Sequence, residues 1–198
     1  RISDVDSSAV EGIAITSLSS GNGAWQYSID GGTSWTSVGS VSDNSALLLR
    51  STDLVRFVPN GQNATTGDFT FRAWDRTHGT HGTYVDSSIS GGTTAFSTAT
   101  EVASITVTAV NDAPVLDAAR TPVLMSVSEH AGAPSGAVGT LVSSLVDFAS
   151  PSGQVDNVTD VDSGANMGIA ITATNAIYGT WWYSTNNGST WLRIGNVF

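Results

Sequence analysis

The feature that most constrains this chain is an internal repeat. Residues 1–42 align without a gap with residues 157–198, and 18 of the 42 positions are identical. The longest shared blocks are Asp-Val-Asp-Ser from positions 4 and 160, Gly-Ile-Ala-Ile-Thr from 12 and 168, and Trp-x-Tyr-Ser from 25 and 181. Because self-similarity at a fixed offset marks copies of one structural unit, we expect parts of two modules with a period of about 156 residues.

This period predicts that the 198-residue chain starts partway through one module and ends partway through the next. We place the boundary at residues 110–115, where a strand-like pattern stops at a proline-containing linker. Residues 1–110 are then the C-terminal part of one module. Residues 111–198 are a linker and the N-terminal part of the next, and residues 111–156 correspond to a lead-in that the first module lacks.

The apolar pattern predicts β-structure throughout. Residues 103–109 alternate small or apolar residues with hydroxyl residues, as a strand with one buried face does, and residues 69–74 follow the same period. Further short strands are expected at residues 46–50 and 54–58, and residues 76–100 are expected to form a long polar insertion, as a loop or a small hairpin. No window keeps a helical period. The expected fold is an all-β, antiparallel β-sandwich.

The composition excludes several classes of partner. The chain has no cysteine, no lysine and a net charge of −10. Nucleic acids and anionic membrane surfaces require clustered cations, so neither is an expected partner. No apolar run reaches the roughly 18 residues of a membrane span, so insertion is not expected either. An acidic, β-prone chain without thiols is most typical of an extracellular protein.

A hairpin is predicted where the strand-like residues 25–28 and 34–38 flank Asp-Gly-Gly. Residues 28–35 resemble the Asp-box of sialidases and other β proteins, and residues 184–191 repeat the motif with Asn186 in place of the aspartate. A hairpin cap tolerates this change but an acid catalyst does not, and no second carboxylate across a cleft is evident. We therefore expect no enzyme activity and a structural role for four residues: Asp30, Trp35, Asn186 and Trp191.

Two Asp-x-Asp pairs recur in register, Asp4 with Asp6 and Asp160 with Asp162. Two carboxylates one residue apart can face a single hard cation, and Ca²⁺ accepts six to eight oxygen ligands at flexible angles. The alternative is a solvated acidic turn. Recurrence of the pair and the excess of 14 Asp over 3 Glu favour calcium.

These pairs occur together with three other motifs: an Ala-x-Asp ending at Asp75, the linker Asn-Asp-Ala-Pro from Asn111, and Val-Ser-Glu-His around Glu129. The combination resembles the cadherin-like repeats of giant secreted bacterial adhesins, which are often associated with type I secretion. The resemblance implies immunoglobulin- or cadherin-like sandwiches in tandem, with calcium bound where one module meets the next.

The resemblance also implies the ligands of that calcium. At the junction inside this chain they are Asn111, Asp112, Asp160 and Asp162. At the equivalent end of the first module they are Asp4, Asp6 and Asp75. Glu129 resembles the first-strand glutamate that serves the far end of the second module. The linker departs from the fuller Asp-x-Asn-Asp-Asn-x-Pro of animal cadherins, which leaves the number of ions per junction open.

Two other groups of residues are candidates for binding. Strand alternation places Trp181 and Tyr183 on one face, expected in the core like Trp25 and Tyr27, and Trp182 on the other. Trp182 is either a platform for a sugar or partner, or a residue packed under a loop. The two histidines of the insertion, His78 and His81, lack further metal ligands and are expected to be solvated.

The expected function is a non-catalytic spacer of a large extracellular adhesin or surface filament, with neighbouring repeats as its partners. One alternative is a module that binds glycan or a cell surface through Trp182 or the insertion. Another is a subunit that self-assembles, with residues 111–156 of one copy completing residues 1–110 of the next. Missing strands would leave backbone groups unpaired, so a lone chain is expected to be marginally stable or to complete itself.

Overall fold

The computed structural model describes residue 2, residue 4 and residues 10–195. The chain divides into two compact units, Arg1–Asn111 and Asp112–Phe198, one residue away from the boundary expected from the sequence. The strands pair almost entirely in antiparallel sheets, so the protein is an antiparallel β-protein, as predicted. Among the described residues, no helix is long and apolar enough to cross a bilayer.

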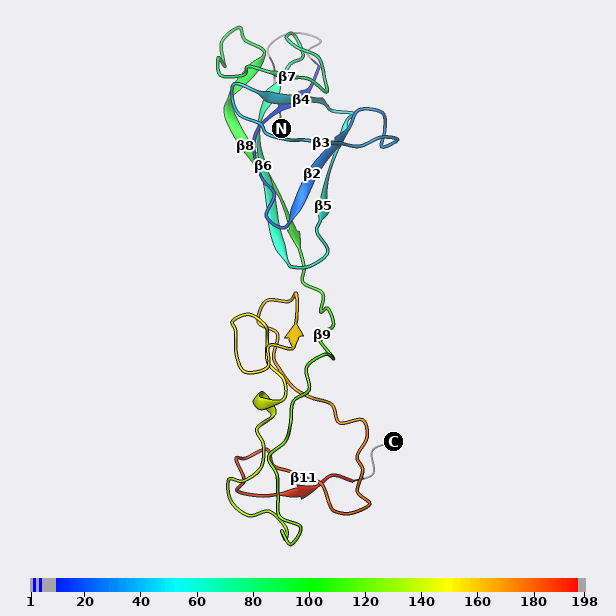
Figure 1. Ribbon diagram of the computed structural model, residues 1–198. Coiled ribbons are helices and arrows are strands. Elements are labelled where there is room, and N and C mark those ends of the chain that lie inside the picture. Colours follow the sequence, from blue (N-terminus) through cyan, green and yellow to red (C-terminus); the bar gives the residue numbers. More distant parts are fainter. Residues whose placement is uncertain (1, 3, 5–9, 196–198) are drawn as a thin grey trace. The chain divides into compact units, whose positions relative to one another are not determined.

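The first unit contains a five-stranded antiparallel sheet with the order β7-β4-β1-β6-β8 (Figure 1). Its strands are β1 (Gly12–Ser19), β4 (Ala46–Arg50), β6 (Thr65–Trp74), β7 (Tyr84–Val85) and β8 (Phe96–Val107). β1 lies in the middle of the sheet, where Ile15 is opposite Leu47 of β4 and Phe71 of β6. The branched and aromatic residues of these strands suit a pleated surface that is buried.

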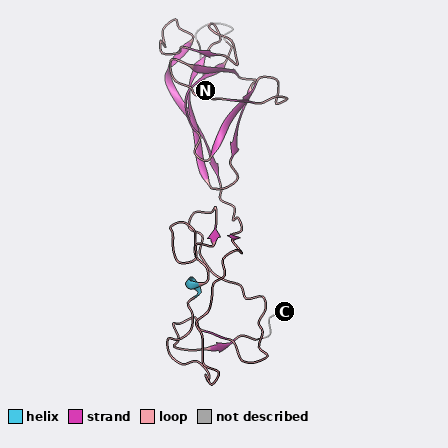
Figure 2. Cartoon of the chain, in the orientation of Figure 1, coloured by secondary structure: helices cyan, strands magenta, loops and turns pink. Residues whose placement is uncertain are grey.

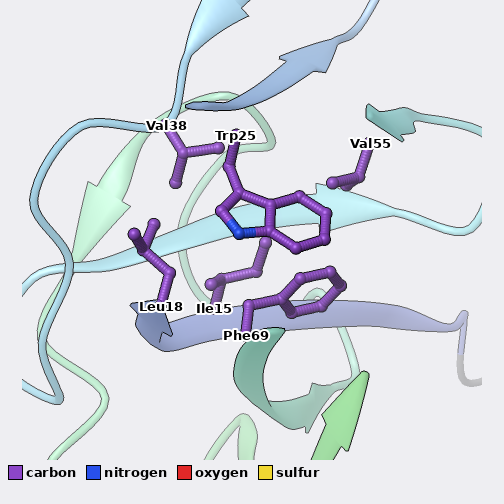
Figure 3. A pocket seen from close by; sticks show the side chains of 6 residues that line it. All are labelled: Ile15, Leu18, Trp25, Val38, Val55 and Phe69. Carbon is purple, nitrogen blue, oxygen red and sulfur yellow. The ribbon is translucent and has the colours of Figure 1, made fainter. Parts of the chain in front are cut away.

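A smaller sheet has the order β3-β2-β5, with β2 (Gly23–Ser28), β3 (Thr36–Ser37) and β5 (Leu54–Pro59). Trp25 of β2 contacts Phe57 and Phe69 edge-on, with both pairs of ring centroids 5.1 Å apart. Ile15 and Leu47 of the larger sheet belong to the same buried cluster, so this core lies between the two sheets. The hollow in Figure 3, lined by Trp25 and five other apolar side chains, leaves no room for a water molecule.

The outer face of the larger sheet is also buried. Leu48 and Trp74 pack there against Ala95 and Phe96. The polar insertion expected over residues 76–100 therefore has a structural role: it contains β7, which pairs with β4, and it supplies buried residues to this second cluster. Consequently β4 is buried along most of its length, which explains its uninterrupted apolar sequence.

Strand β8 is longer and more exposed than its sequence pattern predicts. It starts at Phe96, and beyond residue 98 its apolar side chains are only partly covered: Val102 is 59% exposed and Ile105 is 41% exposed. The prediction of one buried face is therefore wrong for this strand. The physical reason is its position at the end of the sheet, where β6 is its only neighbour among the strands that the structure describes.

The second unit has much less regular structure (Figure 2). A short ladder joins β9 (Val115–Leu116) to β10 (Val158–Thr159), and a second joins β11 (Trp182–Tyr183) to β12 (Leu192–Arg193). A single 3-10 turn, Val142–Ser144, is the one helical element in the part of the chain that the structure describes.

Residues 168–172 show how strongly a strand depends on its neighbours. They repeat the Gly-Ile-Ala-Ile-Thr of β1, but they form no strand, and Ile171 is exposed where its counterpart Ile15 is fully buried. β1 is held between β4 and β6. Residues 168–172 pair with no strand among the residues that the structure describes.

Candidate functional site

The Asp-box-like hairpin of the first unit is closed by side-chain bonds to its own backbone. Ser28 Oγ accepts a hydrogen bond from the Gly32 N–H (2.8 Å) and donates one to Asp30 Oδ1 (2.7 Å). Asp30 accepts from the Ser34 N–H (2.9 Å) and from Ser34 Oγ (2.6 Å). Gly31 and Gly32 have φ angles of 72° and 92°, which only glycine adopts freely. Trp35 Nε1 donates to the Gly32 carbonyl at 3.1 Å.

The second hairpin has the same geometry with an amide in place of the carboxylate. Ser184 Oγ accepts from the Gly188 N–H (2.9 Å), and Asn186 Oδ1 accepts from the Thr190 N–H (2.9 Å). Asn186 Nδ2 donates to Thr190 Oγ1 at 2.8 Å, which reverses the direction of the corresponding bond to Asp30. Trp191 differs, because its Nε1 donates to the carbonyl of Gly136 and not to the turn. An amide can close a turn but cannot act as an acid catalyst. The residue at this position therefore closes the turn in both hairpins.

The electrostatics of Asp30 agree with this role. Hydrogen bonds from the side chain and backbone of Ser34 and from Ser28 lower its pKa from 3.8 to about 2. A carboxyl group that stays ionised to such low pH is a poor proton donor near neutrality, whereas a glycosidase needs an acid whose pKa is raised. The bonds of Asp30 therefore suit a turn and not an acid catalyst.

We predict that Asp30 titrates near pH 2 in an NMR titration of the side-chain carboxyl carbons of the full chain. Since the folded pKa lies below the unfolded value, the contribution of Asp30 to stability is present above about pH 4 and is lost as the pH falls through about 2. Asp30→Asn should remove this acid-dependent step and keep the hairpin, because Asn186 closes the same turn. A titration of Asp30 at or above pH 3.8 would contradict the prediction.

The linker aspartate and the second Asp-x-Asp pair lie together in the second unit. The Asp112 N–H donates to Asp162 Oδ2 at 2.7 Å, and the Asp162 N–H donates to Asp160 Oδ1 at 2.9 Å. The ladder between β9 and β10 explains this proximity, because it pairs Val115, just after the linker, with Thr159, just before Asp160. Three of the four residues that the family resemblance implies for this junction are therefore joined by hydrogen bonds.

Asp75 and Glu129, two of the other predicted ligands, lie elsewhere. Asp75 follows β6 and accepts hydrogen bonds from the N–H and the hydroxyl of Thr77, at 2.8 and 2.7 Å, so it closes a local turn. Asp4 is described but Asp6 lies outside the described residues, and Asn111 is the last residue of the first unit. Glu129 is exposed beside His130. Across the described residues, no three Asp, Glu or His side chains form a group arranged to hold a metal ion.

The aromatic residues of the second hairpin depart from the prediction. Trp25 and Tyr27 are buried in the first unit, as expected, but Trp181 and Tyr183 are 40% and 43% exposed. The hairpin itself keeps its register, since Gln26 is opposite Ser37 and Trp182 is opposite Arg193 at the corresponding positions. The difference is that, among the described residues, β11 and β12 form a sheet of two strands with no further strand beside them. Trp182 is half-buried, and the Arg193 guanidinium lies 5.0 Å from the centre of its ring system.

The two histidines differ from each other. His78 is exposed, as predicted, but His81 is half-buried and its Nδ1 lies 3.2 Å from Asp53 Oδ2. The geometry of this contact is not that of a hydrogen bond, and the contact is an ion pair only when His81 is protonated. Asp53 also pairs with Arg50, with Nη2 2.8 Å from Oδ1. Sequence reasoning missed this cluster because His81 reaches Asp53 from a distant loop.

Comparisons of this chain with protein-family models, with curated proteins and with solved structures found no match. Its function is therefore argued from its own residues.

Proposed function

We propose that this protein is a non-catalytic structural repeat, a spacer of a large extracellular adhesin or surface filament. In this proposal, immunoglobulin- or cadherin-like modules are joined by linkers that calcium stiffens, and the neighbouring repeats are the main partners. The observation that carries the proposal is the hydrogen-bonded set of Asp112, Asp160 and Asp162 at the start of the second unit.

The donor chemistry of this set suits calcium. The carboxylates of Asp160 and Asp162 belong to one turn, in which the Asp162 N–H binds Asp160, and Asp112 lies in the linker beside them. Their oxygens are the hard ligands that Ca²⁺ prefers, and water and backbone carbonyls complete its shell in such sites. In this proposal, a bound ion ties the linker to the unit that follows it.

The absence of catalysis is part of the same proposal. Asp30 resembles a catalytic residue only through its motif, and its bonds close a turn. The acidic surface, with a net charge of −10, suits a repeat that must stay soluble beside many copies of itself.

The proposal is tested by thermal melting of the full chain in calcium, in magnesium and in chelator, together with calorimetric titration of CaCl₂. Ligand that binds only the folded state adds about 2.7 kcal/mol of stability at a free concentration 100 times its Kd. We expect calcium, and not magnesium, to raise the melting temperature by several degrees and to bind with measurable heat.

The variants Asp160→Ala and Asp162→Ala should lose most of this shift. Asp117→Ala is the matched control, because Asp117 is an exposed aspartate in the same unit whose carboxylate lies 3.7 Å from Arg120. Equal melting in calcium and chelator would contradict the proposal, as would a calcium shift that survives in Asp160→Ala.

A further inference from the structure

We propose that the outer face of the sheet β3-β2-β5 binds the carboxylate of an acidic saccharide, through a row of hydrogen-bond donors that includes Arg56. The ligand class is a saccharide that contains uronic acid units. This inference goes beyond the spacer function and does not depend on calcium.

The row crosses all three strands of this sheet. Gln26 of β2 lies directly opposite Arg56 of β5 and Ser37 of β3, so the three side chains are neighbours on one face. Trp25 and Tyr27, on either side of Gln26 in β2, are buried in the core between the two sheets. Because successive side chains of a strand point to opposite faces, the row lies on the outer face of the sheet.

Arg56 is held in place without a carboxylate. Its Nε and Nη2 donate to Gln26 Oε1 at 2.8 and 2.6 Å, and its guanidinium carbon lies 4.0 Å from the centre of the Trp35 ring system. Among the described residues Arg56 makes no ion pair, whereas Arg72 of the same unit contacts the Asp43 carboxylate at 3.2 Å. A guanidinium that is fixed in advance keeps its charge for a ligand and loses little freedom on binding.

The unused groups of the row are hydrogen-bond donors. In the part of the chain that the structure describes, Arg56 Nη1 and Gln26 Nε2 make no hydrogen bond. Ser37 Oγ accepts from the Gly39 N–H at 3.4 Å, which leaves its hydroxyl proton to donate. Guanidinium, amide and hydroxyl donors at neighbouring positions suit an anionic acceptor, and a guanidinium can bind a carboxylate with two parallel hydrogen bonds.

Apolar side chains flank the row on the same face. Leu54 and Val58 stand two residues before and after Arg56 in β5, and they are 42% and 38% exposed. A sugar ring carries C–H groups beside its oxygens, so it fits a polar row between apolar side chains. A nucleic acid needs clustered cations, and this row offers a single one. An acidic saccharide, with one carboxylate among several neutral hydroxyl groups, therefore matches the row best.

The second hairpin has a similar contact made by different residues. Trp182 occupies the position of Gln26, 156 residues later, and Arg193 occupies the position of Ser37. The Arg193 guanidinium carbon lies 5.0 Å from the centre of the Trp182 ring system. The motif that closes the turn includes neither position. An arginine over a tryptophan thus recurs on this row although the residues that supply it differ.

The test is an NMR titration of the full chain, followed through the indole Nε1–H signal of Trp35 and the Nε–H signal of Arg56. The probes are short oligosaccharides of galacturonate, of guluronate, and of glucuronate alternating with N-acetylglucosamine. Each is also used as its methyl ester, which keeps the sugar rings and removes the charge. Chelator is present throughout, so the outcome is independent of the calcium junction.

Three variants locate the site. Arg56→Gln removes the cation. Gln26→Glu keeps an oxygen for the two bonds from Arg56 but adds a carboxylate that competes with the ligand. Arg76→Gln is the matched control, because Arg76 is an exposed arginine of the same unit outside the row. None of the three positions belongs to a core cluster, so the variants should fold, which circular dichroism would verify.

We expect at least one of the three charged probes to shift both signals in the wild-type chain and in Arg76→Gln. Because a charge-assisted hydrogen bond is lost, binding should weaken at least about tenfold in Arg56→Gln, in Gln26→Glu and for the methyl ester. The melting shift that calcium is proposed to cause should be the same in Arg56→Gln as in the wild type, so the two proposals fail separately.

No shift with any of the three charged probes would overturn the inference. Equal binding of a probe and its methyl ester would do so as well, and so would an equal loss in Arg76→Gln, which would indicate attraction to net charge alone. A hexaglutamate peptide provides the last comparison. If it bound more tightly than all three saccharides, the site would be one for acidic peptides and the choice of a saccharide would be wrong.

Discussion

Replacing Trp74 with alanine should lower the free energy of unfolding of the first unit by about 3–5 kcal/mol, the usual cost of truncating a buried aromatic side chain. Trp74 ends β6 and is 2% exposed, in the cluster that fills the outer face of the larger sheet. Its Nε1 donates to the His78 carbonyl at 2.8 Å, so the ring also holds the start of the insertion. A side chain at position 12 would clash with this ring, which explains the glycine there.

The measurement is urea unfolding of the full chain followed by far-ultraviolet circular dichroism. A loss of 3–5 kcal/mol is a large part of the stability of a typical domain, so the urea midpoint of the variant should fall well below that of the wild type. Trp182→Ala is the control, because it removes the same side chain from a half-buried position in the second unit. Equal losses in the two variants would mean that the outer face of the sheet is not a core.

Replacing Asp53 with alanine should cost about 3 kcal/mol, because the Arg50 guanidinium loses a buried counter-charge. The Asp53 side chain is 1% exposed and accepts from the Arg50 backbone N–H at 2.7 Å as well as from the guanidinium. Asp43→Ala is the matched control in the same unit. Its carboxylate pairs with Arg72 at 3.2 Å but is 52% exposed, so its removal should cost at most about 1 kcal/mol.

The effect of Asp53 should depend on pH. Burial raises the pKa of its carboxyl, but the hydrogen bonds and charge of Arg50 and the nearby His81 outweigh burial and hold the pKa below 3.8. A carboxyl with a lowered folded pKa stabilises the protein above its unfolded value and loses this effect as the pH falls through the folded pKa. The difference between wild type and Asp53→Ala should therefore be full above about pH 4 and shrink in stronger acid. A difference that grows in acid would contradict this assignment.

Local patterns in the sequence were sufficient to predict much of the first unit. The hairpin around Asp30 depends on hydrogen bonds between residues four positions apart, and the residues that form these bonds are part of its sequence motif. The strands β4 and β5 likewise follow from short apolar runs between turns. The unit boundary follows from a repeat and a proline, which are features of the chain itself.

Features that depend on distant residues were not predicted. The insertion looks polar because its few apolar residues, such as Ala95 and Phe96, are separated by turns, and only the fold shows that they cover a second core. The contact between Asp53 and His81 has no sequence spacing that would reveal it. Trp181 and Tyr183 show a second limit of prediction from sequence. The same residue types at corresponding positions are buried in the first unit and exposed in the second. Burial is decided by neighbouring strands and not by the motif.

The hairpin that both units share also affects folding. It can help similar segments of the chain to avoid pairing with strands of the wrong unit. Its closing bonds span four residues, so it can form within about 1–10 μs. The central strand of the large sheet pairs Gly12 with Trp74, which is far away in the sequence. This pairing forms more slowly, because a long loop has to close first. Segments with the same sequence, such as residues 12–16 and 168–172, are the ones most at risk of exchange between copies. If the hairpin of each unit forms first, it holds the preceding segment close to the other strands of the same unit. This reduces pairing between the two units while they fold.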